Sequence, residues 1–104
     1  MSIYRDTARF KEWARQLTAF INSDFVAFKP NVEALRPRAL YVYRSIYNRA
    51  VNGILHVPSQ QDLAQEIGMQ PHDLRQYIAQ FERDGVVDLL HVKGTKIKGT
   101  YIKF

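Results

Sequence analysis

The chain of 104 residues contains no cysteine. Disulfide scaffolds, thiolate zinc sites and cysteine nucleophiles are therefore excluded, and the composition fits a reducing cytoplasm. Long apolar runs are also missing, because none approaches the roughly 18 residues that a membrane-spanning helix needs. Six charged side chains lie within the first twenty residues, so this stretch is not the apolar core of a signal peptide. We therefore expect a cytoplasmic protein without a membrane segment.

The motifs of common enzymes are missing as well. The sequence has no glycine-rich phosphate loop, no H-E-x-x-H and no G-x-S-x-G. Asp62 and Glu66 would share one helix face, but charged helix faces usually face solvent. His56 and His91 could approach each other on neighbouring strands, yet two histidines without a nearby carboxylate make a poor metal site. We therefore predict no enzymatic activity, no catalytic residue, no metal and no cofactor.

Charge of one sign is in excess. The net charge is +5 and the isoelectric point is near 9.7, which indicates an anionic partner, most commonly a nucleic acid. The excess is uneven, since residues 1–55 carry +5, residues 56–90 carry −4 and residues 91–104 carry +4. The apolar fraction of 46% and the charged fraction of 24% are typical of a single folded domain.

The first half of the chain predicts two amphipathic helices. Apolar residues recur at helical spacing over residues 6–22, which predicts the first helix. A connection follows, in which residues 32–35 can make one helical turn. The second helix is predicted over residues 37–51, because a proline fits its first position and Asn52-Gly53 can end it.

The second half predicts two further helices close together. Ser59 followed by Asp62 is a capping-box pattern, which predicts a helix over residues 60–67. Another helix is predicted over residues 71–84, because a proline stands at its start and a glycine directly after its end. The joint between these helices has about three residues and includes a glycine, which forces a steep crossing. This is the helix-turn-helix arrangement.

Strand periodicity surrounds these helices. A very short strand is predicted at residues 54–57. Two longer strands are predicted at residues 86–92 and 97–104, with a hairpin turn at residues 93–96 between them. Because two strands alone are marginally stable, we expect residues 54–57 to pair as the third strand.

The order of elements predicts a mainly α fold with a small β-sheet (α+β). It is a winged helix-turn-helix over residues 37–104, preceded over residues 1–36 by an additional helix and a connection that serve packing or dimerisation. The run DLAQEIG at residues 62–68 and the run FERDGVV at residues 81–87 resemble the DNA-binding domain of the cyclic-AMP receptor protein family. This resemblance covers residues 59–104 and implies a winged helix that binds double-stranded DNA.

The exposed face of the helix at residues 71–84 departs from that family. The family typically carries two arginines and a glutamate there, where this chain has Pro71, His72 and Gln76, so operator preferences are not carried over. Arg75 could bind guanine, Gln76 could bind adenine, and Asp73 could cap the helix, accept from cytosine or orient Arg75. The predicted base-reading residues are Gln70, His72, Asp73, Arg75 and Gln76.

Phosphate contacts are expected from two other places. The amide end of the helix at residues 60–67, at Ser59 and Gln60, would face a phosphate. The hairpin lysines would reach the backbone or the minor groove, and would position the protein rather than specify sequence. These lysines are Lys93, Lys96 and Lys98. Lys103 is interpreted as a solvated side chain.

The N-terminal helix has three possible roles. Its aromatic face could cover the core of its own domain, or it could form a homodimer interface, which we favour because a single winged helix contacts few base pairs. Its basic side chains could instead contact phosphates. The predicted dimer residues are Phe10, Trp13, Leu17 and Phe20, and the basic residues are Arg5, Arg9, Lys11 and Arg15.

Two functions from different classes follow from this fold. The first is sequence-specific binding of double-stranded DNA by a small bacterial, phage or plasmid transcription regulator, with residues 71–84 in the major groove and residues 93–98 on the backbone or minor groove. The second is a winged-helix adaptor that binds a protein, or an accessory factor in replication or partition. The acidic charge over residues 62–90 favours a protein partner, whereas the basic hairpin and the polar recognition face favour DNA.

Overall fold

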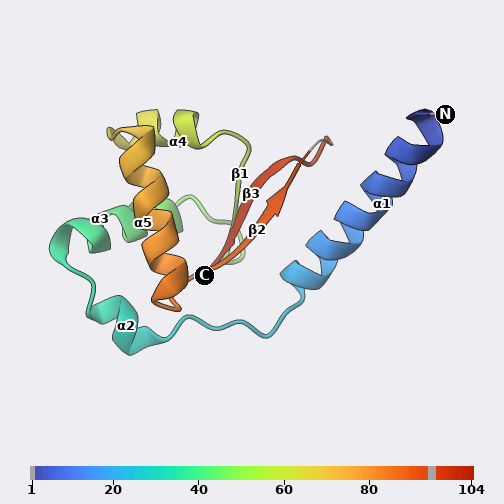
Figure 1. The fold of residues 1–104 in the computed structure, drawn as a ribbon. Helices are drawn as coiled ribbons and strands as arrows, with labels where there is room; N and C mark the ends of the chain where they lie inside the picture. The colour runs from blue at the N-terminus through green and yellow to red at the C-terminus, as the bar shows by residue number, and fades with distance from the viewer. Residues whose placement is uncertain (1, 94–95) are drawn as a thin grey trace.

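The computed structural model describes residues 2–93 and 96–104, with side chains from residue 9 onward. The predicted hairpin turn includes Gly94 and Thr95, which lie outside the described residues. Figure 1 shows the arrangement of the elements. They are α1 (Ser2–Ile21), α2 (Lys29–Glu33), α3 (Pro37–Tyr47), β1 (Ile54–Val57), α4 (Gln60–Ile67), α5 (Pro71–Arg83), β2 (Asp88–Val92) and β3 (Gly99–Lys103).

The three strands form one antiparallel sheet in the order β1-β3-β2. Ile102 of β3 lies between Leu55 of β1 and Leu89 of β2, whereas the preceding Tyr101 lies opposite Leu90. Because successive side chains point to opposite faces, the sheet has an inner face at Ile102 and an outer face at Tyr101. Helices α3, α4 and α5 lie on the inner side and α1 lies on the outer side (Figure 1). The predicted α+β fold is confirmed, and its helices and three-stranded antiparallel sheet are consistent with the predicted winged helix.

The main core lies between the inner face and the helices. Leu74 and Phe81 of α5 and Ile102 of β3 are completely buried. The ring of Tyr43 on α3 meets the Phe81 ring edge-on at 5.5 Å between centroids, and its hydroxyl donates to the Val86 carbonyl at 3.3 Å. Burial, with a smaller contribution from nearby Tyr47, raises the pKa of Tyr43 above its ordinary value. This core holds α5 firmly at a defined orientation.

Helix α4 has the bounds that its local signals predicted. The Ser59 hydroxyl accepts a hydrogen bond from the Asp62 backbone N–H at 3.2 Å, which satisfies one free donor of the first turn. Gly68 follows the helix in the left-handed conformation, with φ of 75°.

Helix α5 is delimited in a similar way. Pro71 occupies its first turn, and the helix ends at Arg83, one residue before the predicted end. Gly85 has φ of 71°, and the Val86 N–H donates to the Phe81 carbonyl at 3.0 Å. This is the Schellman geometry that glycine permits.

The predicted end of the second helix is wrong. Helix α3 ends at Tyr47 rather than at residue 51. Asn52 and Gly53 both have positive φ, 53° and 78°, and Val51 and Ile54 exchange hydrogen bonds of 2.8 and 3.1 Å across them. The Asn-Gly pair therefore forms a two-residue hairpin turn instead of ending a helix, because both sites favour left-handed backbone.

Other predicted bounds shift by a few residues. Helix α1 begins at Ser2 rather than at residue 6, because a stripe of apolar residues marks the buried part of a helix and not its full length. The short helix α2 spans residues 29–33 rather than 32–35, since Pro30 favours its first turn. Strands β2 and β3 are shorter than predicted, since their outer residues do not join the ladder.

Helix α2 is attached to the far end of α5. The Phe28 N–H donates to the Gly85 carbonyl at 3.4 Å, and the Asn31 side-chain amide donates to the Asp84 carbonyl at 2.8 Å. Leu35, which follows α2, is buried in the main core. The connection between α1 and α3 is therefore fastened where α5 ends.

Candidate nucleic-acid interface

Helices α4 and α5 form the predicted helix-turn-helix. Residues 68–70 join them, and α5 turns Leu74, Ile78 and Phe81 into the core. The opposite side of its first turns is consequently exposed. Gln70, His72, Arg75 and Gln76 are all exposed there, as the base-reading prediction requires.

Two of these side chains interact with each other. The side-chain nitrogen Nε2 of Gln76 lies 3.1 Å from Nε2 of His72, one helical turn away. One of the two nitrogens must donate and the other accept, so the pair favours the histidine tautomer whose Nε2 is an acceptor. The pair thus presents an amide and an imidazole in a fixed relation.

Asp73 is less exposed than the other four predicted base-reading residues and shares a hollow with one of them, Gln76. It is half-buried and lines an open hollow between α3 and α5 together with Arg38 and Arg83. Asp73 therefore lies on the side of α5 that borders α3.

The start of α4 is connected to the sheet. The Gln60 side-chain nitrogen donates to Thr100 Oγ1 at 3.3 Å, and His91 Nδ1 lies 3.0 Å from the same oxygen. The Gln60 side chain is thereby directed toward β3, so the backbone amides at Ser59 and Gln60 are the groups left for an anion. Sequence reasoning missed Thr100, a buried polar residue that connects α4, β2 and β3.

The hairpin that follows β2 carries the predicted lysines. Lys93, Lys96 and Lys98 are all exposed. The Tyr101 hydroxyl donates to the Ile97 carbonyl at 2.6 Å, which fastens the returning arm of the hairpin. Burial raises the pKa of Tyr101 above its ordinary value.

Gly99 allows this hairpin to lie close to β1. Its φ is 138°, and an added Cβ would lie 2.7 Å from the Val57 carbonyl oxygen and 2.9 Å from Pro58 Cα. Residues other than glycine rarely adopt this backbone conformation, and the neighbouring backbone atoms leave no room for a Cβ.

The two histidines do not lie on neighbouring strands, as the sequence had allowed. His56 lies on β1 and His91 on β2, and β3 separates these strands. The His56 ring instead stacks on Tyr101 at 4.2 Å between centroids, with its Nε2 3.0 Å from the Lys98 carbonyl oxygen. Each histidine thus contacts β3 from the strand on its own side, His56 at Tyr101 and His91 at Thr100.

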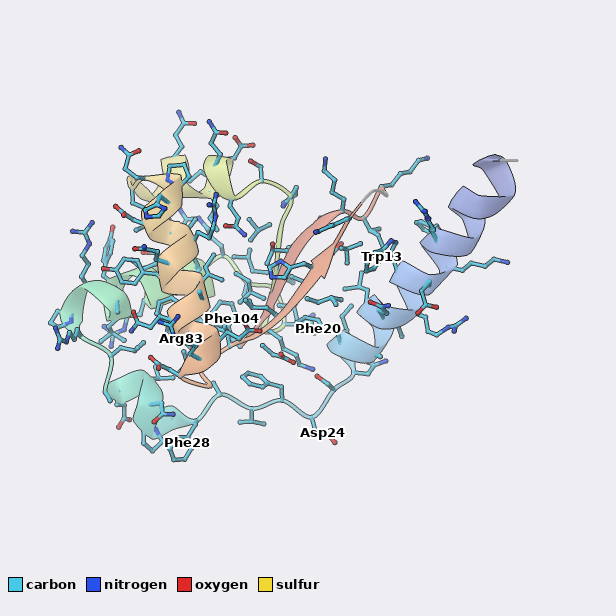
Figure 2. All side chains as sticks on the ribbon, viewed as in Figure 1. Trp13, Phe20, Asp24, Phe28, Arg83 and Phe104 are labelled. Atoms are coloured by element: carbon cyan, nitrogen blue, oxygen red, sulfur yellow. The ribbon has the colours of Figure 1, made fainter. Side chains whose placement is uncertain are left out.

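Helix α1 packs on the outer face of the sheet. Phe20 is 8% exposed and forms a buried cluster with Val92 and Tyr101, against which Trp13 and Leu17 also pack. Three of the predicted dimer residues, Trp13, Leu17 and Phe20, thus cover their own domain. The fourth, Phe10, is 42% exposed. Figure 2 shows Trp13 and Phe20 on the side of α1 that faces the sheet.

The interpretation of Lys103 as a solvated side chain is wrong. Its Nζ donates to the carbonyl oxygens of Phe20, Ile21 and Ser23 at 3.1, 2.8 and 2.5 Å. It also lies 3.0 Å from the Ser23 hydroxyl. A cation that binds the free carbonyls at a helix C-terminus is favourable. Lys103 thus attaches the end of α1 to β3, over a separation of about 80 residues that no local pattern reveals.

Within residues 2–93 and 96–104, no helix is long and apolar enough to span a membrane.

Comparison with known proteins gives similarity to named regulators. No protein-family model matches the chain, and no solved structure matches it. The fatty acid metabolism regulator protein of Pasteurella multocida is 30% identical over 76 residues, which cover 70% of this chain and 32% of that protein. The protein of the same name from Haemophilus influenzae is 32% identical over 73 residues, which cover 67% of this chain and 30% of that protein. The chain spans about a third of the length of these relatives, to which it is similar over one part of their sequence.

Proposed function

We propose that this chain binds double-stranded DNA in a sequence-specific manner and regulates transcription. The observation that carries the proposal is spatial: the joint of α4 and α5 lies at the same end of the molecule as the end of β2 and the start of β3 (Figure 1). A helix fits the major groove, and a basic hairpin beside it can reach the neighbouring backbone. The similarity to proteins named as regulators supports this reading.

Base reading is assigned to the exposed start of α5. Arg75 would bind guanine O6 and N7 through its guanidinium, and Gln76 would bind adenine N6 and N7 through its amide. The contact with His72 would orient the Gln76 amide before DNA arrives. Gln70 lies next to them, and Asp73 would act from the α3 side, where it lines the hollow with Arg38.

Backbone binding is assigned to α4 and the hairpin. The first amides of α4 would face one phosphate, because the N-terminus of a helix favours an anion. Lys93, Lys96 and Lys98 would contact the backbone or the minor groove. Such contacts add affinity and salt dependence but little sequence information.

The wider setting is part of the same proposal. A bacterial, phage or plasmid regulator that acts in the cytoplasm fits the similarity to proteins from two bacteria. The resemblance of residues 59–104 to the cyclic-AMP receptor protein family stays a prediction, alongside the similarity to fatty acid metabolism regulators.

A homodimer is also proposed, because two recognition helices reading two half-sites bind more tightly than one. Phe10 is the predicted dimer residue that its own domain leaves exposed. We expect sedimentation equilibrium to show a dimer that Phe10→Ser weakens, and a selected DNA site with two half-sites. A monomer at all concentrations tested would contradict this part of the proposal.

The test is selection from a pool of random duplexes, followed by sequencing of the bound fraction and anisotropy titrations at low and moderate salt. We expect one enriched motif. Arg75→Ala/Gln76→Ala should abolish the enrichment while leaving weak binding to any duplex. Lys93→Glu/Lys96→Glu should weaken binding to all duplexes and flatten the salt dependence.

Two control variants make the same kinds of substitution at exposed positions outside the proposed DNA-binding surface. Arg15→Ala/Gln16→Ala removes an adjacent arginine and glutamine from the exposed side of α1, and Lys11→Glu/Lys29→Glu reverses two exposed lysine charges outside the hairpin. Both should keep the motif. Binding no tighter than that of a generic basic protein, unchanged by either site variant, would refute DNA recognition and would favour a protein partner.

A further inference from the structure

A hollow opens between α1 and the end of β2. Arg9, Glu12 and Trp13 line it from α1, and Lys93 lines it from the hairpin. The Glu12 carboxylate lies 3.4 Å from Arg15 Nη1, which offsets its negative charge. Two cations from separate elements, Arg9 and Lys93, thus line the same space as this paired carboxylate. Like charges brought together in this way favour an anion between them.

The fold sets the distance between these two cations. Trp13 and Leu17 pack against the outer cluster of the sheet, and Lys103 holds the last carbonyls of α1. Helix α1 is therefore fastened to the sheet at its C-terminal end and along its middle. Arg9 lies one turn before Trp13, so its position beside Lys93 follows from this packing.

The hollow is also placed where a bound duplex would pass. In Figure 1, the N-terminal half of α1 points toward the same end of the molecule as the end of β2 and the α4–α5 joint. The start of α5, the outer end of the β2–β3 pair and α1 follow one another in that view, so a duplex lying along this end would meet them in that order.

From this geometry we propose that Arg9 and Lys93 together bind one DNA backbone phosphate, which makes α1 a second backbone-binding element beside the hairpin. The inference rests on the proposed DNA binding and adds a residue and an element to it. A guanidinium and an ammonium would share the phosphate oxygens through charge-assisted hydrogen bonds. The contact would extend the footprint and fix the register without reading sequence.

The experiment compares salt dependence between two α1 variants of equal charge, Arg9→Gln and Lys11→Gln. The two residues are two positions apart, roughly 200° around the helix, so only Arg9 faces the hollow. With a fixed duplex, Arg9→Gln should lower the slope of log affinity against log salt by about 0.9, the loss of one phosphate contact. Lys11→Gln should leave the slope near that of the wild type.

A double variant tests whether the two cations share one phosphate. Arg9→Gln/Lys93→Gln should lose no more slope than the larger single loss, because one phosphate is counted once. Trp13 is the chain's only tryptophan, so its emission reports directly on the hollow. Duplex DNA should change this emission in the wild type and in Lys11→Gln, and should change it much less in Arg9→Gln.

Several outcomes would overturn the inference. Equal slopes for Arg9→Gln and Lys11→Gln would reduce the effect to net charge, and additive losses in the double variant would mean two separate phosphates. A change of oligomeric state in Arg9→Gln would assign the hollow to a second copy. If duplex binding needs Arg75 and Gln76 but is indifferent to Arg9, the inference fails while the proposed function stands. If the wild type binds no duplex, both fail.

Discussion

The two faces of the sheet are covered very differently. On the inner face, α3, α4 and α5 build a core in which Phe81, Leu74 and Ile102 are completely buried. On the outer face, the buried cluster consists of Phe20 from the single helix α1 and of Val92 and Tyr101 from the sheet. The inner core thus stabilises the helix-turn-helix, whereas α1 is attached through a small contact and one lysine. The element proposed to read DNA and the element proposed to extend its footprint therefore differ in stability.

The difference has a physical consequence for α1. Most of the stability of a helix in a protein comes from the packing of its apolar face rather than from the helix itself. Its helicity therefore depends on the outer cluster and on Lys103, and it should open locally before the inner core unfolds. The following predictions test this contrast.

The largest effect is expected from Phe81→Ala on the inner side. Removal of a completely buried ring should cost about 3–5 kcal/mol of unfolding free energy, enough to unfold a marginal domain. Urea denaturation followed by circular dichroism measures this. A loss below 1 kcal/mol would contradict the description of the inner core.

Phe20→Ala makes the same substitution on the outer side. We expect a loss of about 2 kcal/mol, the burial free energy of one phenylalanine, confined to α1. Far-ultraviolet circular dichroism should show lost helix at temperatures where the rest remains folded. A single cooperative transition with the same loss as Phe81→Ala would mean that the two faces fold as one unit.

Gly99→Ala addresses the hairpin between the two faces. A Cβ at this position would lie under 3 Å from backbone atoms of Val57 and Pro58, so we expect a loss of about 1–3 kcal/mol. Gly68→Ala is the control, because a Cβ there meets nothing within 4 Å and only its φ is unfavourable. Equal losses in thermal denaturation would show that the close approach to β1 has no cost.

Lys103→Met removes the cation at the end of α1 and keeps most of the apolar stem. We expect a loss of about 1 kcal/mol, felt as faster hydrogen exchange in the last turn of α1. Lys98→Met, which alters an exposed lysine of the hairpin, should leave that exchange unchanged. Unchanged protection in both variants would remove Lys103 from the attachment of α1.

The smallest effect concerns alkaline pH. Burial raises the pKa of Tyr43 inside the inner core and that of Tyr101 on the outer face. The unfolded chain therefore loses these tyrosine protons at lower pH than the folded protein does. The contribution of the two tyrosines to the free energy of unfolding is constant below about pH 10, and it is lost as the pH rises through the folded pKa values. Tyr43→Phe should reduce the fall for global unfolding, measured by urea denaturation between pH 9 and 11. An unchanged fall would show that Tyr43 ionises freely in the folded state.

Local signals explain which parts of the fold were predictable. Helix α4 has the bounds that Ser59, Asp62 and Gly68 indicated, because a cap and a left-handed glycine act within one turn. The Asn52-Gly53 pair gave a wrong helix end, since the same two residues are favourable at a helix end and in a hairpin turn. The pairing of Val51 with Ile54 decided between them.

The candidate site likewise has one part that local signals predicted and another that they did not. The exposed start of α5 was predictable, because burial of Leu74, Ile78 and Phe81 leaves the opposite face in solvent. The placement of Asp73 beside α3 and of Arg9 beside Lys93 was not, since each depends on an element distant in sequence.

The sequence by itself determined the order of elements, the helix-turn-helix joint and the basic hairpin, because spacing and capping act between near neighbours. Tertiary structure alone decided which face of the sheet α1 covers, where Lys103 binds and which cations share a hollow. Those outcomes depend on contacts across about 80 residues, where a lysine that looks solvated in the sequence meets the free carbonyls of a helix end.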